Sequence, residues 1–236
     1  MTDAKTDKKI ETQARAESRW PAVAAIVVAL TLYALLPSSF IPALRFSVVG
    51  IGIALLVPAI LVNPLKLERQ TKLSRVLSIA LASLLVLANQ VALVQLIIQL
   101  LVPEDKDKAP VLLLAALQVW VTNIIVFALV FWELDRGGPV TRTQAKREEL
   151  PEADFRFPQD EDADTVTEVA MKSSKKSNWT ANFIDYLYFS LGNAMAFSPP
   201  DAMPLTNRSK IIVGLEALGA YVLLVLVIAR AVSLLG

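Results

Sequence analysis

DYLYFSLGNAMAFSPPDAMPLT, residues 185–206, is the stretch of sequence that decides the fold, and it precedes the apolar run 211–235. It places a short amphipathic helix, a proline-containing loop and a helix of membrane length in the order of a re-entrant pore loop. The helical segment 183–197 is too short to cross a hydrocarbon core of about 30 Å at about 1.5 Å per residue. Two interpretations stay open: the segment dips into the membrane beneath covering protein, or it lies in the membrane interface.

The composition indicates a membrane protein and excludes most enzyme classes. Of the 236 residues, 55% are hydrophobic, which exceeds the roughly 45–50% of soluble domains. The chain contains neither cysteine nor histidine, so disulfides, thiolate or imidazole metal ligands and Ser-His-Asp chemistry are excluded. We therefore expect no enzymatic activity, no cofactor and no metal site. The net charge of +1 gives no reason to expect a nucleic-acid partner.

The apolar runs predict an all-α polytopic membrane protein, with five transmembrane helices and a re-entrant pore-like helix-loop before the last helix. Each run has the roughly 17–25 residues that cross a bilayer. The predicted spans are 20–36, 46–62, 76–102, 109–132 and 211–235. The predicted organisation is an N-terminal tail at 1–19, a four-helix transmembrane region at 20–132, a polar loop at 133–179, and a pore-loop-like helix, filter-like loop and last transmembrane helix at 180–236.

Basic residues are distributed unevenly between the connections, and this bias predicts an orientation. The tail, the second connection and the loop 133–179 are rich in lysine and arginine, whereas the opposite side carries only Arg45, Lys106 and Lys108. The positive-inside rule then places the N-terminus and the long loop in the cytoplasm and the C-terminus outside. We expect membrane lipids as partners and a mobile polar loop with a docking point at residues 155–158.

Residues 188–206 resemble the pore domain of potassium channels. That family combines an aromatic-Phe-Ser start of the pore helix, the filter Thr-Val-Gly-Tyr-Gly-Asp, a Pro-x-Thr and an inner helix. Here Phe189-Ser190-Leu191 opens the segment, Asp201 falls in register with the filter aspartate, and Pro204-Leu205-Thr206 matches the Pro-x-Thr. Gly214 and Gly219 lie in the last apolar run, where the family often has a hinge glycine.

The filter itself departs from the family pattern. Ala196-Phe197-Ser198-Pro199-Pro200 stands where Thr-Val-Gly-Tyr-Gly would be. Because proline fixes φ near −65°, Pro200 cannot copy a glycine with positive φ. Potassium selectivity of the usual kind is therefore not implied. The charge bias also has this loop entering from the cytoplasm, whereas the pore loop of potassium channels enters from outside.

A longer part of the chain is similar to a family of uncharacterised bacterial membrane proteins. The matching stretches are FWELDRGGP at 131–139, FPQ at 157–159 and FSPPDAMPL at 197–205. Pro200 replaces a threonine of that family's loop and so removes a hydroxyl that could have lined a pore. This resemblance implies the bacterial inner (plasma) membrane as the location, and it supplies no established activity.

The resemblance to potassium channels implies a homo-oligomer, a tetramer if it forms a pore, that conducts monovalent cations. Asn193, Ala196, Phe197 and Ser198 would line the constriction, and Phe197 could instead gate it by dewetting. Asp201 would be the carboxylate at the mouth, and the C-terminus of the pore helix would favour cations. The alternative is a non-conducting scaffold or accessory membrane protein that uses the same fold with a sealed loop.

Glu216 lies inside the last apolar run, and an intramembrane charge is by default a functional-site hypothesis. It can face a water-filled vestibule, meet a basic residue on another helix, or reach the interface from near a helix end. Polar residues also align in the third and fourth spans, where interhelical hydrogen bonding is the ordinary explanation and the lining of a permeation path is the sharper one. These residues are Asn89, Gln90, Gln95, Gln99, Gln118, Thr122 and Asn123.

Overall fold

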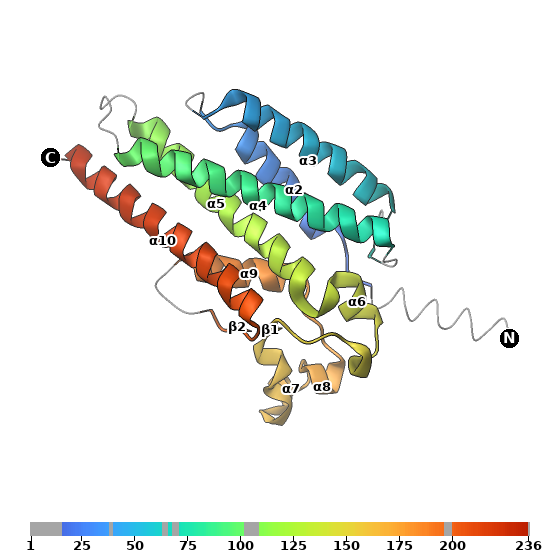
Figure 1. Ribbon diagram of the computed structural model, residues 1–236. Coiled ribbons are helices and arrows are strands. Elements are labelled where there is room, and N and C mark those ends of the chain that lie inside the picture. Colours follow the sequence, from blue (N-terminus) through green and yellow to red (C-terminus); the bar gives the residue numbers. More distant parts are fainter. Residues whose placement is uncertain are drawn as a thin grey trace.

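The computed structural model describes residues 16–37, 40–62, 66–67, 71–101, 109–195 and 200–235 of the chain. The long helices lie side by side, and a smaller polar region sits at one end of them (Figure 1). The long helices are α2 (Trp20–Ala34), α3 (Pro42–Val62), α4 (Lys72–Leu101), α5 (Ala109–Leu134) and α10 (Asn207–Leu235).

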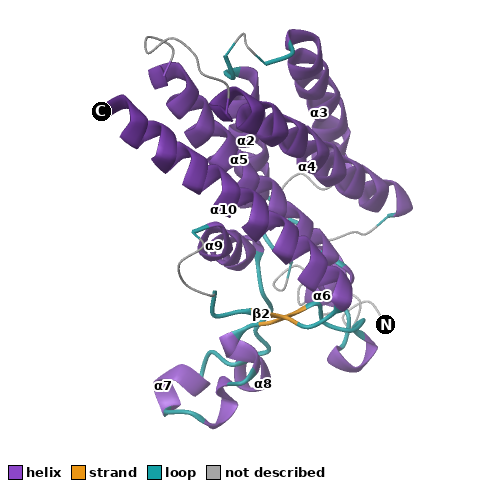
Figure 2. Cartoon of the chain, turned by 60° about the vertical axis from the view of Figure 1, so that its left-hand side comes forward, coloured by secondary structure: helices purple, strands orange, loops and turns teal. Residues whose placement is uncertain are grey.

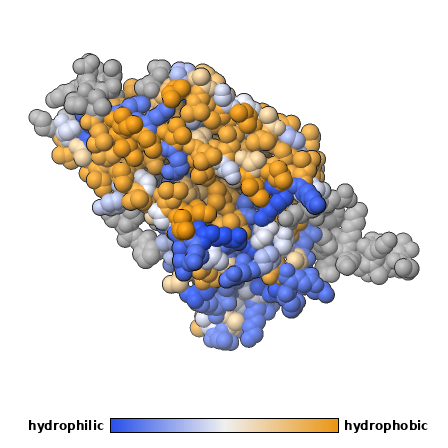
Figure 3. All heavy atoms as spheres, viewed as in Figure 1, coloured by the Kyte–Doolittle hydropathy of each residue, from blue (hydrophilic) through white to orange (hydrophobic). Residues whose placement is uncertain are grey.

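Four of these helices are long and apolar enough to cross a membrane. They are α3, α4, α5 with its extension to Gly137, and α10. Figure 3 shows the apolar surface that these helices present, with hydrophilic residues gathered below it. The structure therefore indicates an integral membrane protein with mainly helical structure, as the sequence predicts.

The first predicted span is shorter in the structure than in the sequence interpretation. α2 contains 15 residues, which is about 22 Å and less than the hydrocarbon core. The helix ends in a turn at Leu35 because Pro37 disfavours the helical conformation of the residue before it. A fifth span through α2 stays a prediction.

α5 is the central helix of the bundle. It packs against α2, α4, α9 and α10, and most of its residues are buried on every side, as expected for a helix that is apolar all round. Asn89 Nδ2 on α4 donates a hydrogen bond to Asn123 Oδ1 on α5 at 2.8 Å. Gln118 Nε2 donates to the Leu35 carbonyl at 3.4 Å. For these residues the prediction of interhelical hydrogen bonding is confirmed.

Residues 133–179 differ from the predicted mobile loop, because the structure packs them against the bundle. They form α6 (Pro139–Gln144), β1 (Phe155–Arg156), α7 (Thr167–Ala170) and α8 (Ser174–Ser177), joined by short 3₁₀ turns. Phe155 and Phe157 are buried at 0% and 5% exposure, which confirms the docking point predicted at 155–158. The sequence shows no apolar period here because single side chains, rather than a helix face, enter the core.

The segment after α8 forms α9 (Phe183–Ala194) and β2 (Met203–Pro204). β1 and β2 pair antiparallel, with Phe155 opposite Pro204 and Arg156 opposite Met203. In Figure 2, α9 lies between α10 and this two-stranded ribbon. The ribbon ties the residues just before α10 to the polar region.

Candidate functional site

The start of α9 is fixed by two caps at the polar end of the bundle. Asn182 Oδ1 accepts a hydrogen bond from Ile184 N at 2.9 Å, and Asp185 Oδ2 accepts one from Asn182 N at 2.8 Å. Glu17, from the segment before α2, accepts a hydrogen bond from Phe183 N at 2.7 Å. Carboxylates at this end of a helix satisfy unpaired N–H groups and complement the helix dipole.

Glu17 and Asp185 are themselves buried enough to change their ionisation. Burial raises the pKa of Glu17 above its ordinary value, although the guanidinium of Arg142 and the hydrogen bonds from Phe183 and Trp132 oppose this. Burial likewise raises the pKa of Asp185. At the start of α9, Phe183 and Tyr186 are buried, whereas Asn182 and Ile184 are exposed.

From this start, α9 packs against α5, with Phe183 beside Trp132 and its last residue, Ala194, beside Trp120. The ring of Phe183 lies 5.9 Å from that of Trp132, and the ring of Phe189 lies 5.3 Å from that of Phe131. At the other end of α9, Trp120 Nε1 donates a hydrogen bond to the Ala194 carbonyl at 3.4 Å.

These contacts give the length of α5 that α9 covers. Trp120 and Trp132 lie about 18 Å apart along α5, which equals the length of a helix with the 12 residues of α9. Trp120 also lies near the midpoint of α5, whose bounds are Ala109–Leu134. The last residue of α9 therefore contacts the side chain of a residue near the middle of α5.

A buried polar cluster joins α9 to α10, and we call its residues Ser190, Asn193 and Glu216 the carboxyl cluster. Asn193 Nδ2 donates a hydrogen bond to Glu216 Oε2 at 2.6 Å and another to the Val213 carbonyl at 3.1 Å. Ser190 Oγ contacts Glu216 Oε1 and lies 2.8 Å from the Ile124 carbonyl of α5. Glu216 is 0% exposed.

The structure answers one question that the sequence left open for Glu216. Among the described residues, its hydrogen-bond partners are the neutral side chains of Ser190 and Asn193 rather than a basic residue, and its side chain is buried within the protein. Ser190 and Asn193 occur one helical turn apart on α9 and so reach the same face of α10. The sequence interpretation included Asn193 and Glu216 but missed Ser190 as their partner.

The other predicted site residues that the structure describes do not contact this cluster. Pro200 packs back against α9, 3.4 Å from the position that a Cβ on Gly192 would take, and Asp201 is exposed. Gly214 has open space beside it, whereas Gly219 approaches Leu93 of α4 closely. The predicted filter residues Ala196, Phe197, Ser198 and Pro199 lie outside the described residues.

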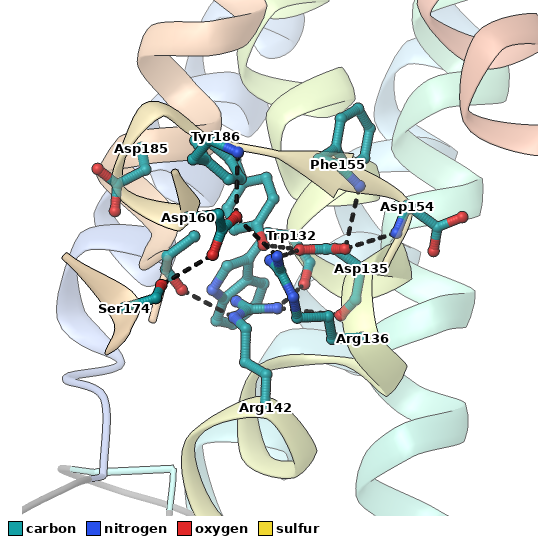
Figure 4. Close-up of polar contacts among 12 residues, drawn as sticks. Trp132, Asp135, Arg136, Arg142, Asp154, Phe155, Asp160, Ser174, Asp185 and Tyr186 are labelled. Carbon is teal, nitrogen blue, oxygen red and sulfur yellow. Dashed lines mark hydrogen bonds and ion pairs between the residues drawn. The ribbon is translucent and has the colours of Figure 1, made fainter. Parts of the chain in front are cut away.

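A second buried polar network, which the sequence interpretation missed, anchors the polar end of α9 (Figure 4). Asp135, at the end of α5, is fully buried and accepts hydrogen bonds from Asp154 N at 2.8 Å and Phe155 N at 3.2 Å. Its second carboxylate oxygen accepts a 2.6 Å hydrogen bond from the Tyr186 hydroxyl and a 2.8 Å bond from Arg136. Burial is the main cause that raises the pKa of Tyr186 well above its ordinary value.

Arg142 of α6 completes this network beneath α9. Its guanidinium is buried and donates to the carbonyls of Ala181 at 2.8 Å and Trp132 at 2.7 Å. It also lies 4.9 Å from the ring centre of Tyr186 and 3.5 Å from a carboxylate oxygen of Glu17. One arginine thus connects the N-terminal segment, α5, α6 and the start of α9.

Asp154 fixes the start of α10 in the same region. Its carboxylate accepts two hydrogen bonds from Arg208, at 2.7 and 2.6 Å, and one from Thr206. Its carbonyl accepts from Leu205 N at 2.8 Å. These part-buried contacts hold the start of α10 to the polar region. The LDRGGP run at residues 134–139 is the sequence signal that could have identified Asp135.

The comparisons with known proteins and the search for metal ligands add no identification. No family model, curated protein or solved structure matches the chain. Within the described residues, no group of three or more acidic side chains is placed to hold a metal ion.

Proposed function

We propose that this chain is an integral membrane protein in which α9 and the segment after it form a re-entrant hairpin, the pore-loop unit of a homo-oligomeric, monovalent-cation pore. The observation that carries the proposal is the contact between Ala194 and Trp120, because it puts the end of α9 near the middle of a helix long enough to cross the bilayer. Pro200 packs back against Gly192, and Pro204 pairs with β1 at the polar end. In the proposed hairpin, the chain runs inward along α9 and returns to its starting side, and the contacts of Pro200 and Pro204 support this path.

The surroundings of α9 suit a helix that ends inside the membrane. α5 and α10 cover one face of it, and backbone at membrane depth is tolerated where protein covers it. The C-terminal end of a helix carries partial negative charge, which favours a cation near Ala194. The exposed Asp201 would add a full negative charge at the mouth.

Site-directed spin labelling measures the depth of both ends of the hairpin. The chain has no cysteine, so single cysteines at Met195 and Met203 give unambiguous labels, and these positions are matched at 53% and 54% exposure. We expect the spin label at 195 to be accessible to dissolved oxygen and inaccessible to a water-soluble nickel complex. The label at 203 should show the reverse. Equal, headgroup-level depths at both positions would mean that α9 lies in the interface.

Conduction is tested by potassium flux into proteoliposomes that contain the full-length protein. We expect flux above that of empty liposomes, and a reduction of about tenfold in Asp201→Asn, because charge at a pore mouth raises the local cation concentration. Asp164→Asn removes another exposed acid, from the polar region, and should leave the flux unchanged.

A non-conducting scaffold is the second candidate function. The observation that favours it is the hydrogen bond between Asn193 and Glu216 within one protomer. Both side chains are buried, and their polar groups contact each other instead of lining a pore. Background flux from the wild type, together with a deep label at 195, would select the scaffold over the pore.

A further inference from the structure

The carboxyl group of Glu216 lies among elements that offer it no charged partner. Residues 76–101 of α4 and 109–132 of α5 contain no charged residue. On α9, Asp185 lies in the first turn, where it caps Asn182 N, and the Tyr186 hydroxyl donates to Asp135. Tyr188 of α9 and Arg208, Lys210 and Tyr221 of α10 are exposed. Arg230 lies about 21 Å from Glu216 along α10. In the described part of these helices, the groups that act on Glu216 are therefore the neutral Ser190 and Asn193.

The hydroxyl group of Ser190 has one hydrogen atom, and its two contacts with oxygen atoms need a second one, which Glu216 can supply. Ser190 Oγ lies within hydrogen-bond distance of both the Ile124 carbonyl and Glu216 Oε1. A carbonyl oxygen only accepts, so the single hydroxyl hydrogen of Ser190 goes to Ile124. The contact with Glu216 then needs a hydrogen on Oε1, with Ser190 Oγ as its acceptor.

The hydrogen atoms of Asn193 agree with this assignment and distinguish the two oxygens of the carboxyl group. Its amide group has two hydrogens, and these reach the Val213 carbonyl and Glu216 Oε2. Oε2 is therefore the accepting, carbonyl-like oxygen of the carboxyl group, and Oε1 is the hydroxyl. With Glu216 neutral, both carboxyl oxygens of Glu216, the Ser190 hydroxyl and the Asn193 Nδ2 group each have a hydrogen-bond partner.

We infer that Glu216 is a proton-binding site inside the membrane, and that its bound proton joins α9 to α10. Removing this proton would leave only the hydroxyl hydrogen of Ser190 at these contacts. Glu216 Oε1 and the Ile124 carbonyl, which both accept hydrogen bonds, would then compete for it. It would also leave an unpaired charge in a fully buried site, which is costly. The attachment of α9 to α10 is therefore present while the proton is bound and is weakened as the pH rises and the proton is lost.

Infrared difference spectroscopy of the full-length protein in lipid tests this assignment directly. A protonated carboxyl group has a carbonyl stretch separate from the bands of a carboxylate. We expect such a band in the wild type at neutral pH and its loss in Glu216→Gln. The matched control is Glu152→Gln, an exposed acid of the polar region, which should keep the band. An identical spectrum for wild type and Glu216→Gln would overturn the inference.

A second variant keeps Glu216 in place, so the test does not depend on the folding of Glu216→Gln. Ser190→Ala removes the hydroxyl oxygen that accepts the hydrogen bond from Glu216. The carboxyl band should therefore shift to higher frequency without disappearing. A band unmoved by this substitution would contradict the assignment. The inference needs neither re-entry nor conduction, because absence of flux would leave the band assignment unaffected.

Discussion

Replacing Asp135 by alanine is expected to destabilise the protein by about 3–5 kcal/mol, the cost of removing one partner from a buried charged network. Asp135 is fully buried and accepts hydrogen bonds from the backbone of Asp154 and Phe155, from Tyr186 and from Arg136. Alanine leaves these donors without an acceptor, and each buried unsatisfied donor adds a desolvation penalty.

Thermal unfolding in detergent micelles measures this effect, with near-ultraviolet circular dichroism reporting on the aromatic cluster around Phe155. Asp164→Ala is the matched control, because its side chain belongs to the same polar region and is exposed. Its unfolding temperature should stay close to that of the wild type. Equal stability of the two variants would show that the buried network does not hold the polar region to the bundle.

Gly138→Ala is expected to cost about 2–4 kcal/mol for two separate reasons. Gly138 has φ of 94°, in a backbone region that alanine adopts only under strain. A Cβ atom at this position would also lie 1.8 Å from Arg75 Nη1. Arg75 can move away, but it then loses its 2.6 Å hydrogen bond to the Gly137 carbonyl and its pairing with Glu133.

The two reasons are separable by a double-mutant cycle. In the Arg75→Ala background the steric conflict is gone, so Gly138→Ala should cost only the backbone strain, and the two substitutions should not add. Gly214→Ala is the control: it lies in α10 with nothing within 4 Å of its would-be Cβ, and alanine favours a helix by up to about 1 kcal/mol. If the destabilisation of the double variant equals the sum of the two single ones, the Arg75 side chain does not contact the turn at Gly138.

Some features of this protein follow from local sequence. The apolar runs were long enough to identify α3, α4, α5 and α10, because a membrane span is specified by consecutive residues alone. The capping residues Asn182 and Asp185 mark the start of α9 in the same way. Pro37 explains the early end of α2, although the sequence interpretation placed that end at Leu36.

Other features depend on residues that are distant in the chain. Glu216 was noticeable as an acid in an apolar run, but its partners Ser190 and Asn193 come from α9, and only packing of the two helices brings them together. Asp135 and Tyr186 are 51 residues apart, and their contact closes the polar region under α9.

The sequence by itself determined which four segments form helices long and apolar enough to cross a membrane, because hydrophobicity over about 20 residues is a local property. Only the tertiary structure decided where the short helix α9 lies and which groups meet the buried acids. A hydrogen bond depends on positions in space to within a few tenths of an ångström, and contacts such as Ala194 with Trp120 join residues 74 apart. A local sequence pattern does not determine a contact between residues so far apart in the chain.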